Sequence, residues 1–417
     1  MRLLPTVYLA SYTLSGLGNS VAAIVLPLVV LQTTGSALAA GTVAAATIVP
    51  AVLAGLLMGV VIDRINRRTS SVITDLISAA AMFALPVVDM ITGLSVGWFV
   101  LFGIIGAVGD VPGITAREAL LPAIIRHGTI SAERITGTRE ALGAVALLVG
   151  PAAAGILVAV WGGTTALWVT AATSLAAALI TLLIPHRVGQ LEAVQDAGGA
   201  RATRAWTQLR EGWSEVIRNG FVRVTTVITI VAVAAIAGLQ GIILPLYFIE
   251  IERPGMVGFV MSAIAAGSLV GGGIHALAGT KGSRRGWFVS GVLGSILGLV
   301  TLATLISVWV LLAGAFMLGF SVGLFGALIG VLSIERIPER KRGRVLGTQN
   351  TFVTAAAPLG IFAAGAITEF TGVHTSLVVL ASVWALGLLF ALFARPMRHL
   401  DAPGVDVLDH SEVPQHA

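Results

Sequence analysis

The amino-acid sequence predicts an all-α membrane protein with twelve transmembrane helices, arranged as two six-helix halves with pseudo-symmetry. Three observations support this fold class: the composition, the spacing of the apolar stretches and an internal repeat. Of the 417 residues, 56% are hydrophobic and only 11% are charged, and the mean hydropathy is +0.96. Soluble domains carry about twice that share of charged residues.

The apolar stretches set the number of spans. Runs of about 18 or more apolar residues mark membrane-spanning helices. We expect twelve, at residues 8–32, 38–61, 71–92, 97–118, 139–161, 164–185, 221–248, 255–279, 287–306, 308–332, 346–368 and 373–394. A membrane β-barrel would show short segments of alternating polarity instead. The first span is too long for a signal-peptide core, so we expect the mature protein to keep it.

The basic residues predict the orientation. If the N-terminus is cytoplasmic, 24 of the 25 Lys and Arg residues fall in cytoplasmic segments and only Arg253 lies outside. Both termini are therefore predicted to be cytoplasmic. The excess of Arg over Lys, with abundant Ala and Gly, suggests a GC-rich bacterial genome, and we expect the protein in the bacterial inner membrane. The net charge of +5 then reflects topology, and nucleic-acid binding is not expected.

The order of the segments gives four regions. We expect a six-helix half at 1–186, a cytoplasmic linker at 187–219, a second half at 220–396 and a disordered acidic tail at 397–417. In the linker, Trp206, Leu209, Trp213 and Val216 recur at helical spacing, which predicts an amphipathic helix at the membrane surface. The alternative is a solvated helix that packs on the bundle.

Three landmarks recur at nearly constant spacing between the halves. Leu26-Pro27-Leu28 recurs as Leu244-Pro245-Leu246 after 218 residues. Arg67-Arg68 recurs as Arg284-Arg285 after 217 residues, and Pro122 recurs as Pro338 after 216. Each lies at the matching place of its half, which indicates a duplicated bundle with parallel repeats.

A charged loop interrupts the apolar sequence between spans two and three. Residues 59–68 read GVVIDRINRR and resemble the signature loop of the major facilitator superfamily, whose defining positions are filled by Gly59, Asp63, Arg64, Arg67 and Arg68. This resemblance covers the whole chain and implies the superfamily fold. The second-half copy, ALAGTKGSRR at 276–285, has Thr280 in place of Asp63.

The chemistry of this loop suits a conformational latch. Gly59 permits close helix packing, and Asp63 can accept hydrogen bonds from Arg64 or face the positive N-terminal end of another helix. The resemblance implies that this helix is span eleven, which begins near Val345, and that the contact opens in each transport cycle. The alternative is that the charges only orient span two.

Two further resemblances point to export. Gly143, Gly150, Pro151 and Gly155 in span five resemble the antiporter motif of exporters in this superfamily, although ordinary small-residue packing is the alternative. The opening SGLGNSVAAIVLPLVVLQTTGSALAAG resembles the macrolide-efflux and enterobactin-exporter branch of drug:H+ antiporters. The sequences at Leu120–Pro122 and Arg342–Gly347 fit the same branch.

The resemblance implies that spans one, four, seven and ten line a central cavity. Polar residues there are substrate-site candidates: Asn19, Ser20, Gln240 and Ser321. Asp110 is the carboxylate placed well inside span four, and it is the candidate for proton coupling. Alternatively, the Val111-Pro112-Gly113 sequence breaks the helix, and Asp110 only forms hydrogen bonds to the backbone groups that this break leaves unpaired.

Other charges within the spans are expected to pair. Arg117 and Glu118 of span four can cross-pair with Arg139 and Glu140 of span five, because these helices run antiparallel. Asp75 lies one turn into span three, within reach of the Arg67 and Arg68 group.

Several classes of function are not expected from this sequence. Cysteine is absent, so no disulfide or thiol chemistry is available, and no nucleotide loop, metal-ligand spacing or nucleophile motif occurs. We therefore expect no enzyme activity, no cofactor and no metal.

The sequence predicts a secondary active transporter that exports an amphipathic small molecule, such as a drug, a macrolide-like compound or a siderophore, in exchange for protons. We expect it to work by alternating access, as a monomer in the lipid bilayer. Two alternatives stay open: a proton-coupled uptake symporter, and a non-transporting sensor or assembly protein that retains the fold.

Overall fold

The computed structural model describes residues 3–54, 65–127, 131–190, 213–214, 216–278, 283–337, 339–398 and 400. Within these ranges all regular structure is helical. Twelve helical segments of this described part are long and apolar enough to cross a membrane, which confirms the predicted number of spans. Their bounds are Leu4–Thr34, Ala37–Ala54, Arg67–Thr92, Val96–His127, Arg134–Trp161, Gly163–Leu182, Gly220–Glu250, Met256–Ala278, Arg284–Ala303, Val308–Ser333, Val345–Thr371 and Val373–Phe393.

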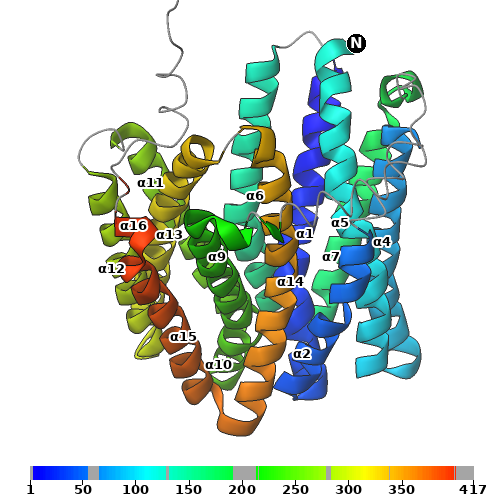
Figure 1. Cartoon of the computed structure of the whole chain (residues 1–417). Coiled ribbons are helices and arrows are strands. Elements are labelled where there is room, and N and C mark those ends of the chain that lie inside the picture. The colour runs from blue at the N-terminus through cyan, green and yellow to red at the C-terminus, as the bar shows by residue number, and fades with distance from the viewer. Residues whose placement is uncertain are drawn as a thin grey trace, which may run out of the picture. The chain divides into compact units, whose positions relative to one another are not determined.

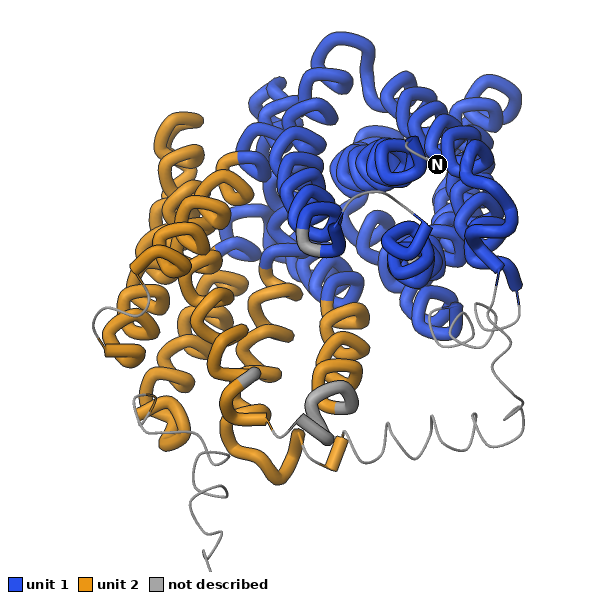
Figure 2. Tube along the Cα trace, turned by 90° about the horizontal axis from the view of Figure 1, so that it is seen from above, with its two compact units in different colours: residues 1–195, 236–262, 357–377 blue, residues 196–235, 263–356, 378–417 orange. Residues whose placement is uncertain are grey.

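The chain divides into two compact units, coloured separately in Figure 2. Unit 1 holds residues 1–195, 236–262 and 357–377, and unit 2 holds residues 196–235, 263–356 and 378–417. Unit 1 thus contains the whole predicted first half together with two segments of the predicted second half. The candidate site residues discussed below fall mainly in unit 1.

Unit 1 is built around α1 (Leu4–Thr34). This helix packs against α6 (Ala132–Trp161) and α7 (Gly163–Leu182), while α4 (Arg67–Thr92) packs against α5 (Val96–His127) and α7 (Figure 1). Its other described elements are α2 (Ala37–Ala46), η1 (His186–Gly189), η2 (Leu239–Ile243) and α10 (Leu244–Glu250), with parts of α9 (Gly220–Gly238), α11 (Met256–Ala278), α14 (Glu339–Thr371) and α15 (Val373–Phe393).

Tight glycine turns join consecutive spans of unit 1. Gly35, Gly93, Gly162 and Gly372 have φ between +66° and +83°, and each directly follows a span. Glycine adopts positive φ without steric cost, so it ends the helix and reverses the chain in a few residues. All four turns fall on the side that the basic residues predict to be external.

Unit 2 contains α12 (Arg284–Ala303), α13 (Val308–Arg336) and α16 (Arg395–Arg398), with the remaining parts of α9, α11, α14 and α15. Small residues set its packing: a Cβ atom at Gly267 or Gly271 of α11 would overlap the backbone of α13. Close approach of this kind is the usual way in which helices associate inside a bilayer, where van der Waals contact replaces the hydrophobic effect.

Residues related by the repeat make equivalent contacts in the two units. Asn66 caps α4 by accepting from the Arg68 amide at 3.0 Å and from the Thr69 amide at 3.3 Å. Ser283, 217 positions later, caps α12 by accepting at 2.9 Å from the amide of Gly286, which corresponds to Thr69. The Arg68 guanidinium donates to the carbonyl of Leu182 at 2.6 Å, and that of Arg285 donates to the carbonyl of Met397 at 3.3 Å. Arg68 thus ties the start of α4 to the end of α7, and Arg285 ties the start of α12 to α16.

Several predictions lie outside the described residues. Gly59, Asp63 and Arg64 of the signature loop are among them, as are Trp206 and Leu209 of the linker and nearly all of the acidic tail. Of the predicted linker helix, Trp213 and Val216 are described, and the Trp213 ring lies 5.0 Å from that of Phe352 in unit 2. The latch and the surface helix therefore stay predictions.

Candidate functional site

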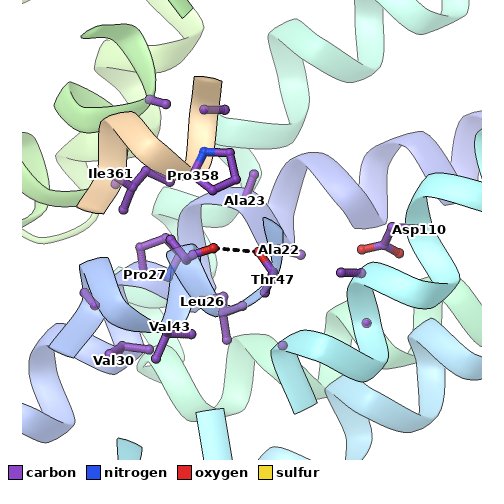
Figure 3. A pocket seen from close by; sticks show the side chains of 18 of the residues that line it. Ala22, Ala23, Leu26, Pro27, Val30, Val43, Thr47, Asp110, Pro358 and Ile361 are labelled. Atoms are coloured by element: carbon purple, nitrogen blue, oxygen red, sulfur yellow. Dashed lines mark hydrogen bonds between the residues drawn. The ribbon is translucent and has the colours of Figure 1, made fainter. Parts of the chain in front are cut away.

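Unit 1 contains a cavity of about 420 Å³. Most of its wall is aliphatic, and its polar side chains are Asn19, Thr47, Asp110 and Gln240. Figure 3 shows Asp110 on one side of this cavity, with Pro358 and Ile361 of α14 on another. The volume falls in the range of pockets that bind small molecules, and a mainly apolar wall with a few polar groups is typical of them.

Small side chains create this space. Ala22 and Ala23 of α1 and Ala40 and Ala44 of α2 line the cavity. The Thr47 hydroxyl is occupied locally, because it donates to the Ala44 carbonyl at 2.7 Å (Figure 3). The polar groups that distinguish the cavity are therefore the carboxylate of Asp110 and the two carboxamides, all of which belong to the predicted set.

Asp110 is held by α4. Its Oδ1 accepts a hydrogen bond from the Ser78 hydroxyl at 2.6 Å. The two helices lie close because of Gly109: a Cβ atom there would be 2.9 Å from the carbonyl oxygen of Thr74. Helix α5 runs unbroken through Pro112. The helix break that the alternative role of Asp110 requires is therefore absent from α5.

A buried ion pair lies nearby on the same two helices. Arg117 of α5 donates to Asp75 of α4, and the two side chains are 7% and 5% exposed. Asp75 also accepts from the Ser15 hydroxyl at 3.3 Å, and the Tyr8 hydroxyl donates to the backbone carbonyl of Arg117 at 3.2 Å. The pair therefore joins α1, α4 and α5.

This pairing differs from the sequence expectation. Asp75 was expected near Arg67 and Arg68, but the Arg68 guanidinium binds the end of α7 instead. Arg117 was expected to cross-pair with span five. Gly109 and Gly113 let α5 approach α4, and Arg117 consequently faces Asp75.

The remaining charges of this region gather around Arg139. Its guanidinium lies 3.5 Å from the carboxylates of both Glu118 and Glu140, and 5.3 Å from the centroid of the Tyr12 ring. Glu118 and Arg139 thus form the cross-pair between α5 and α6. Both glutamates are more than half exposed, so these contacts are weak compared with a buried pair.

Two predicted cavity residues lie elsewhere. Ser20 faces α6, where a Cβ atom at Gly150 would overlap its side chain. Ser321 is buried in unit 2, where its hydroxyl donates to the Met317 carbonyl at 2.9 Å. A Cβ atom at Gly294 of α12 would overlap that hydroxyl. Both serines therefore serve helix packing, because their short side chains fill space beside glycine.

The sequence reasoning missed the roles of Ser15 and Ser78. Helical spacing carried a signal for Ser78, because Asp75 and Ser78 lie one turn apart on α4 while Asp110 and Arg117 lie two turns apart on α5. Residues at such spacing share a face, so the two polar faces were candidates to meet. This spacing gives no signal for Ser15, which lies on α1.

The glycines of the antiporter-like motif divide between two partners. Gly143 faces the hydroxyl of Tyr12 and Gly150 faces Ser20, both on α1. Pro151 and Gly155 instead contact the start of α11, where a Cβ atom at Gly258 would overlap the carbonyl of Pro151. The Ser262 hydroxyl adds a hydrogen bond of 2.5 Å to the carbonyl of Leu148. Together these contacts seal α6 against α11.

A second seal joins α2 to the end of α14. A Cβ atom at Gly41 would lie 3.0 Å from Cα of Phe362. Oε2 of Glu369 accepts from the Ser36 hydroxyl and from the Leu38 amide, each at 3.1 Å. Glu369 thus binds the first turn of α2, where unpaired amides favour a negative charge.

Known proteins match nearly the whole chain. The Major Facilitator Superfamily is matched over residues 8–281 and 238–408. The chain is 31% identical over 397 residues to the multidrug efflux pump Tap of Mycobacterium bovis, and this alignment covers 94% of the chain and 93% of the pump. It is 22% identical over 352 residues to macrolide efflux protein A of Streptococcus pyogenes, with 82% and 84% covered.

Solved structures share the fold at lower identity. The nucleoside transporter NupG aligns with a TM-score of 0.76 at 16% identity, over 96% of this chain and 100% of that one. A D-xylose-proton symporter aligns with a TM-score of 0.69 at 14% identity, over 96% and 99%. These two likenesses concern the fold alone.

Proposed function

Because the chain belongs to the major facilitator superfamily and is a membrane transporter, we propose that it exports amphipathic small molecules in exchange for protons. Two relatives matched along most of their length carry efflux names, one for multiple drugs and one for macrolides. A transporter role agrees with the expectation that the chain is not an enzyme. The proposed location of the protein is the bacterial inner membrane, with both termini in the cytoplasm.

The cavity of unit 1 is the observation that carries this proposal. Its aliphatic wall accepts the hydrophobic body of a substrate, while its few polar groups orient that substrate. Small side chains such as those of Ala22, Ala23 and Ala40 make few shape-specific contacts. Such a wall can accept amphipaths of many shapes, whereas a site for one substrate would fit that substrate closely.

Asp110 is the proposed proton carrier. Placing a carboxylate inside the membrane costs free energy, so such a residue usually has a functional role. Asp110 lines the cavity and is hydrogen-bonded to Ser78, one turn from the Asp75–Arg117 pair on α4. Substrate entering the cavity changes the surroundings of this carboxylate, and proton uptake and substrate release can thereby be linked.

The two seals suggest how access alternates. They involve the ends of α2, α6, α11 and α14 near the turns at Gly35, Gly162 and Gly372. In the proposed orientation these turns are external, so the seals close the cavity from outside. Opening must break the Glu369 contact with α2, and the predicted latch at Asp63 would then form at the cytoplasmic end.

The test of export uses purified protein in proteoliposomes with an imposed pH gradient. Erythromycin, as a macrolide, and ethidium, as an amphipathic dye, are suitable probes, with uridine as a probe for uptake. We expect gradient-dependent movement of erythromycin or ethidium against its concentration gradient. Gradient-dependent accumulation of uridine alone, or movement of none of the three, would rule out the proposed export.

Orientation has its own test. Single cysteines introduced at Gly35 and Gly372 should react with an impermeant thiol reagent added to intact cells, while one at Gly198 should react only after the cells are opened. The chain has no native cysteine, so the background is clean. Labelling at Gly198 in intact cells would overturn the proposed topology.

A further inference from the structure

The cavity is lined by symmetry-related positions of spans one and seven. Pro27 and Pro245 mark the repeat at an offset of 218 residues. Three lining residues of α1, namely Asn19, Ala22 and Ala23, are related by the same offset to the three lining residues of the α9–η2 segment, Ala237, Gln240 and Gly241. Leu26, Pro27 and Val30 also line the cavity from α1, and their counterparts in the second half do not. Over the shared positions, the same face of each span therefore lines the cavity.

The polar groups on these two faces do not follow the symmetry. Asn19 corresponds to Ala237, and Gln240 corresponds to Ala22, so each face carries one carboxamide at a different position. Parallel repeats are related by an axis along the membrane normal, so corresponding residues lie at similar depth. Three residues of helix rise about 4.5 Å, so the two carboxamides are staggered in depth by about that distance.

A π-helical turn holds the second carboxamide. Leu239–Ile243 is a π-helix, whereas α1 stays α-helical through the equivalent Pro27. Pro245 has no amide to donate to the Gly241 carbonyl, but Pro27 lacks the same amide in α1, so the proline alone does not account for the π turn. Gly241 also packs tightly, because a Cβ atom there would lie 3.1 Å from Cγ1 of Ile361. Short π segments of this kind occur frequently at functional sites.

We propose that Asn19 and Gln240 are a specificity-determining pair, which selects amphipaths carrying two uncharged hydrogen-bonding groups such as hydroxyl, amide, ketone or ester. A carboxamide offers one acceptor and two donors without charge, and a substrate that leaves it unpaired forfeits affinity. This inference rests on the proposed transport function and names its substrate class. The walls around the pair are aliphatic, so they accept the hydrophobic frame.

Equilibrium binding to the purified protein in nanodiscs tests the pair with two probes. Chloramphenicol is uncharged and carries an amide and hydroxyls, and tetraphenylphosphonium is an amphipathic cation without hydrogen-bonding groups. Asn19→Leu and Gln240→Met keep the approximate side-chain size. Each should weaken chloramphenicol binding by about 10-fold to 100-fold, since each leaves a hydrogen bond unmade in the cavity. Binding of tetraphenylphosphonium should change less than about twofold.

The repeat supplies a matched control. In the double variant Ala22→Gln with Gln240→Ala, the number of carboxamides is kept but both lie on α1. Chloramphenicol binding should remain weak in this variant. Recovery to the parent affinity would overturn the proposal, because it would show that any polar group in the cavity suffices. Equal loss of both probes in the single variants, or failure of the parent to bind chloramphenicol, would also overturn it.

Efflux measured on the same preparations separates this inference from the proposed function. If the parent binds chloramphenicol through the pair yet moves no probe across proteoliposomes, export fails and the pair stands. If the parent exports ethidium while the three variants bind chloramphenicol like the parent, the pair fails and export stands.

Discussion

The buried Asp75–Arg117 pair gives the most quantitative prediction. Asp75→Leu leaves the Arg117 guanidinium without its partner among side chains that are only 5% and 7% exposed, and Arg117→Leu leaves the carboxylate in the same position. Removing one member of a buried ion pair typically costs about 3–5 kcal/mol, because the remaining charge is desolvated without compensation. Each single variant should lose this amount of unfolding free energy.

The double variant Asp75→Leu with Arg117→Leu should behave differently. No unpaired charge remains, and replacement of a buried pair by apolar side chains is often neutral or stabilising. The double variant should therefore regain most of the stability that either single variant lost. Glu118→Gln is the control, because Glu118 is 56% exposed in its contact with Arg139 and should cost at most about 1 kcal/mol.

Steric trapping in bicelles measures these unfolding free energies at equilibrium, with transport of ethidium followed in parallel. Losses below about 1 kcal/mol in both single variants would refute the burial of the pair. A double variant as unstable as the worse single variant would refute the argument that an unpaired charge is the cause. If the double variant is stable but inactive, the pair serves transport beyond holding α1, α4 and α5 together.

Three further predictions concern the transport cycle. Asp110→Asn should abolish efflux driven by a pH gradient and keep chloramphenicol binding, and gradient-driven efflux at the parent rate would exclude Asp110 as the proton carrier. Gly258→Val should prevent the α6 seal and stop transport, whereas Gly273→Val, where no atom lies within 4 Å of a Cβ, should transport normally. Glu369→Ala removes two hydrogen bonds from the first turn of α2, so a single cysteine at Ala44 should react several-fold faster with an impermeant reagent from outside. An unchanged labelling rate would argue against an outer seal at Glu369.

Hydropathy predicted the spans well because few backbone conformations satisfy their hydrogen bonds inside lipid. Every amide and carbonyl inside the bilayer must be bonded within the segment, so an apolar run of sufficient length becomes a helix. Helix ends were less predictable. Span four was expected to end at residue 118, yet α5 continues to His127. Hydropathy marks where lipid contact ends, and a helix continues beyond that point wherever its charged side chains find water or partners.

The contacts between spans were harder to predict than the spans themselves. Helical spacing assigns Asp75 and Ser78 to one face of α4, but it does not say which neighbour that face meets. The orientation depends on glycines such as Gly109, whose missing side chain lets α5 approach. Asn19, Asp110 and Gln240 were predictable as cavity residues because polar groups inside spans are rare, whereas serine is small enough to pack almost anywhere.

The repeat also indicates where coupling resides. Duplication supplies both halves with the same frame, yet the positions equivalent to Asp75 and Arg117, at the repeat offsets of 217 and 216, are Val292 and Ser333. Val292 is fully buried, and the Ser333 hydroxyl donates to a carbonyl of its own helix at 2.7 Å. The second half thus carries no charge at these two positions, so the repeated frame does not require the ion pair. Ionisable groups inside a membrane are costly, so the Asp75–Arg117 pair, which has no charged counterpart at the two equivalent positions, is where a contribution to the proposed proton coupling should be tested.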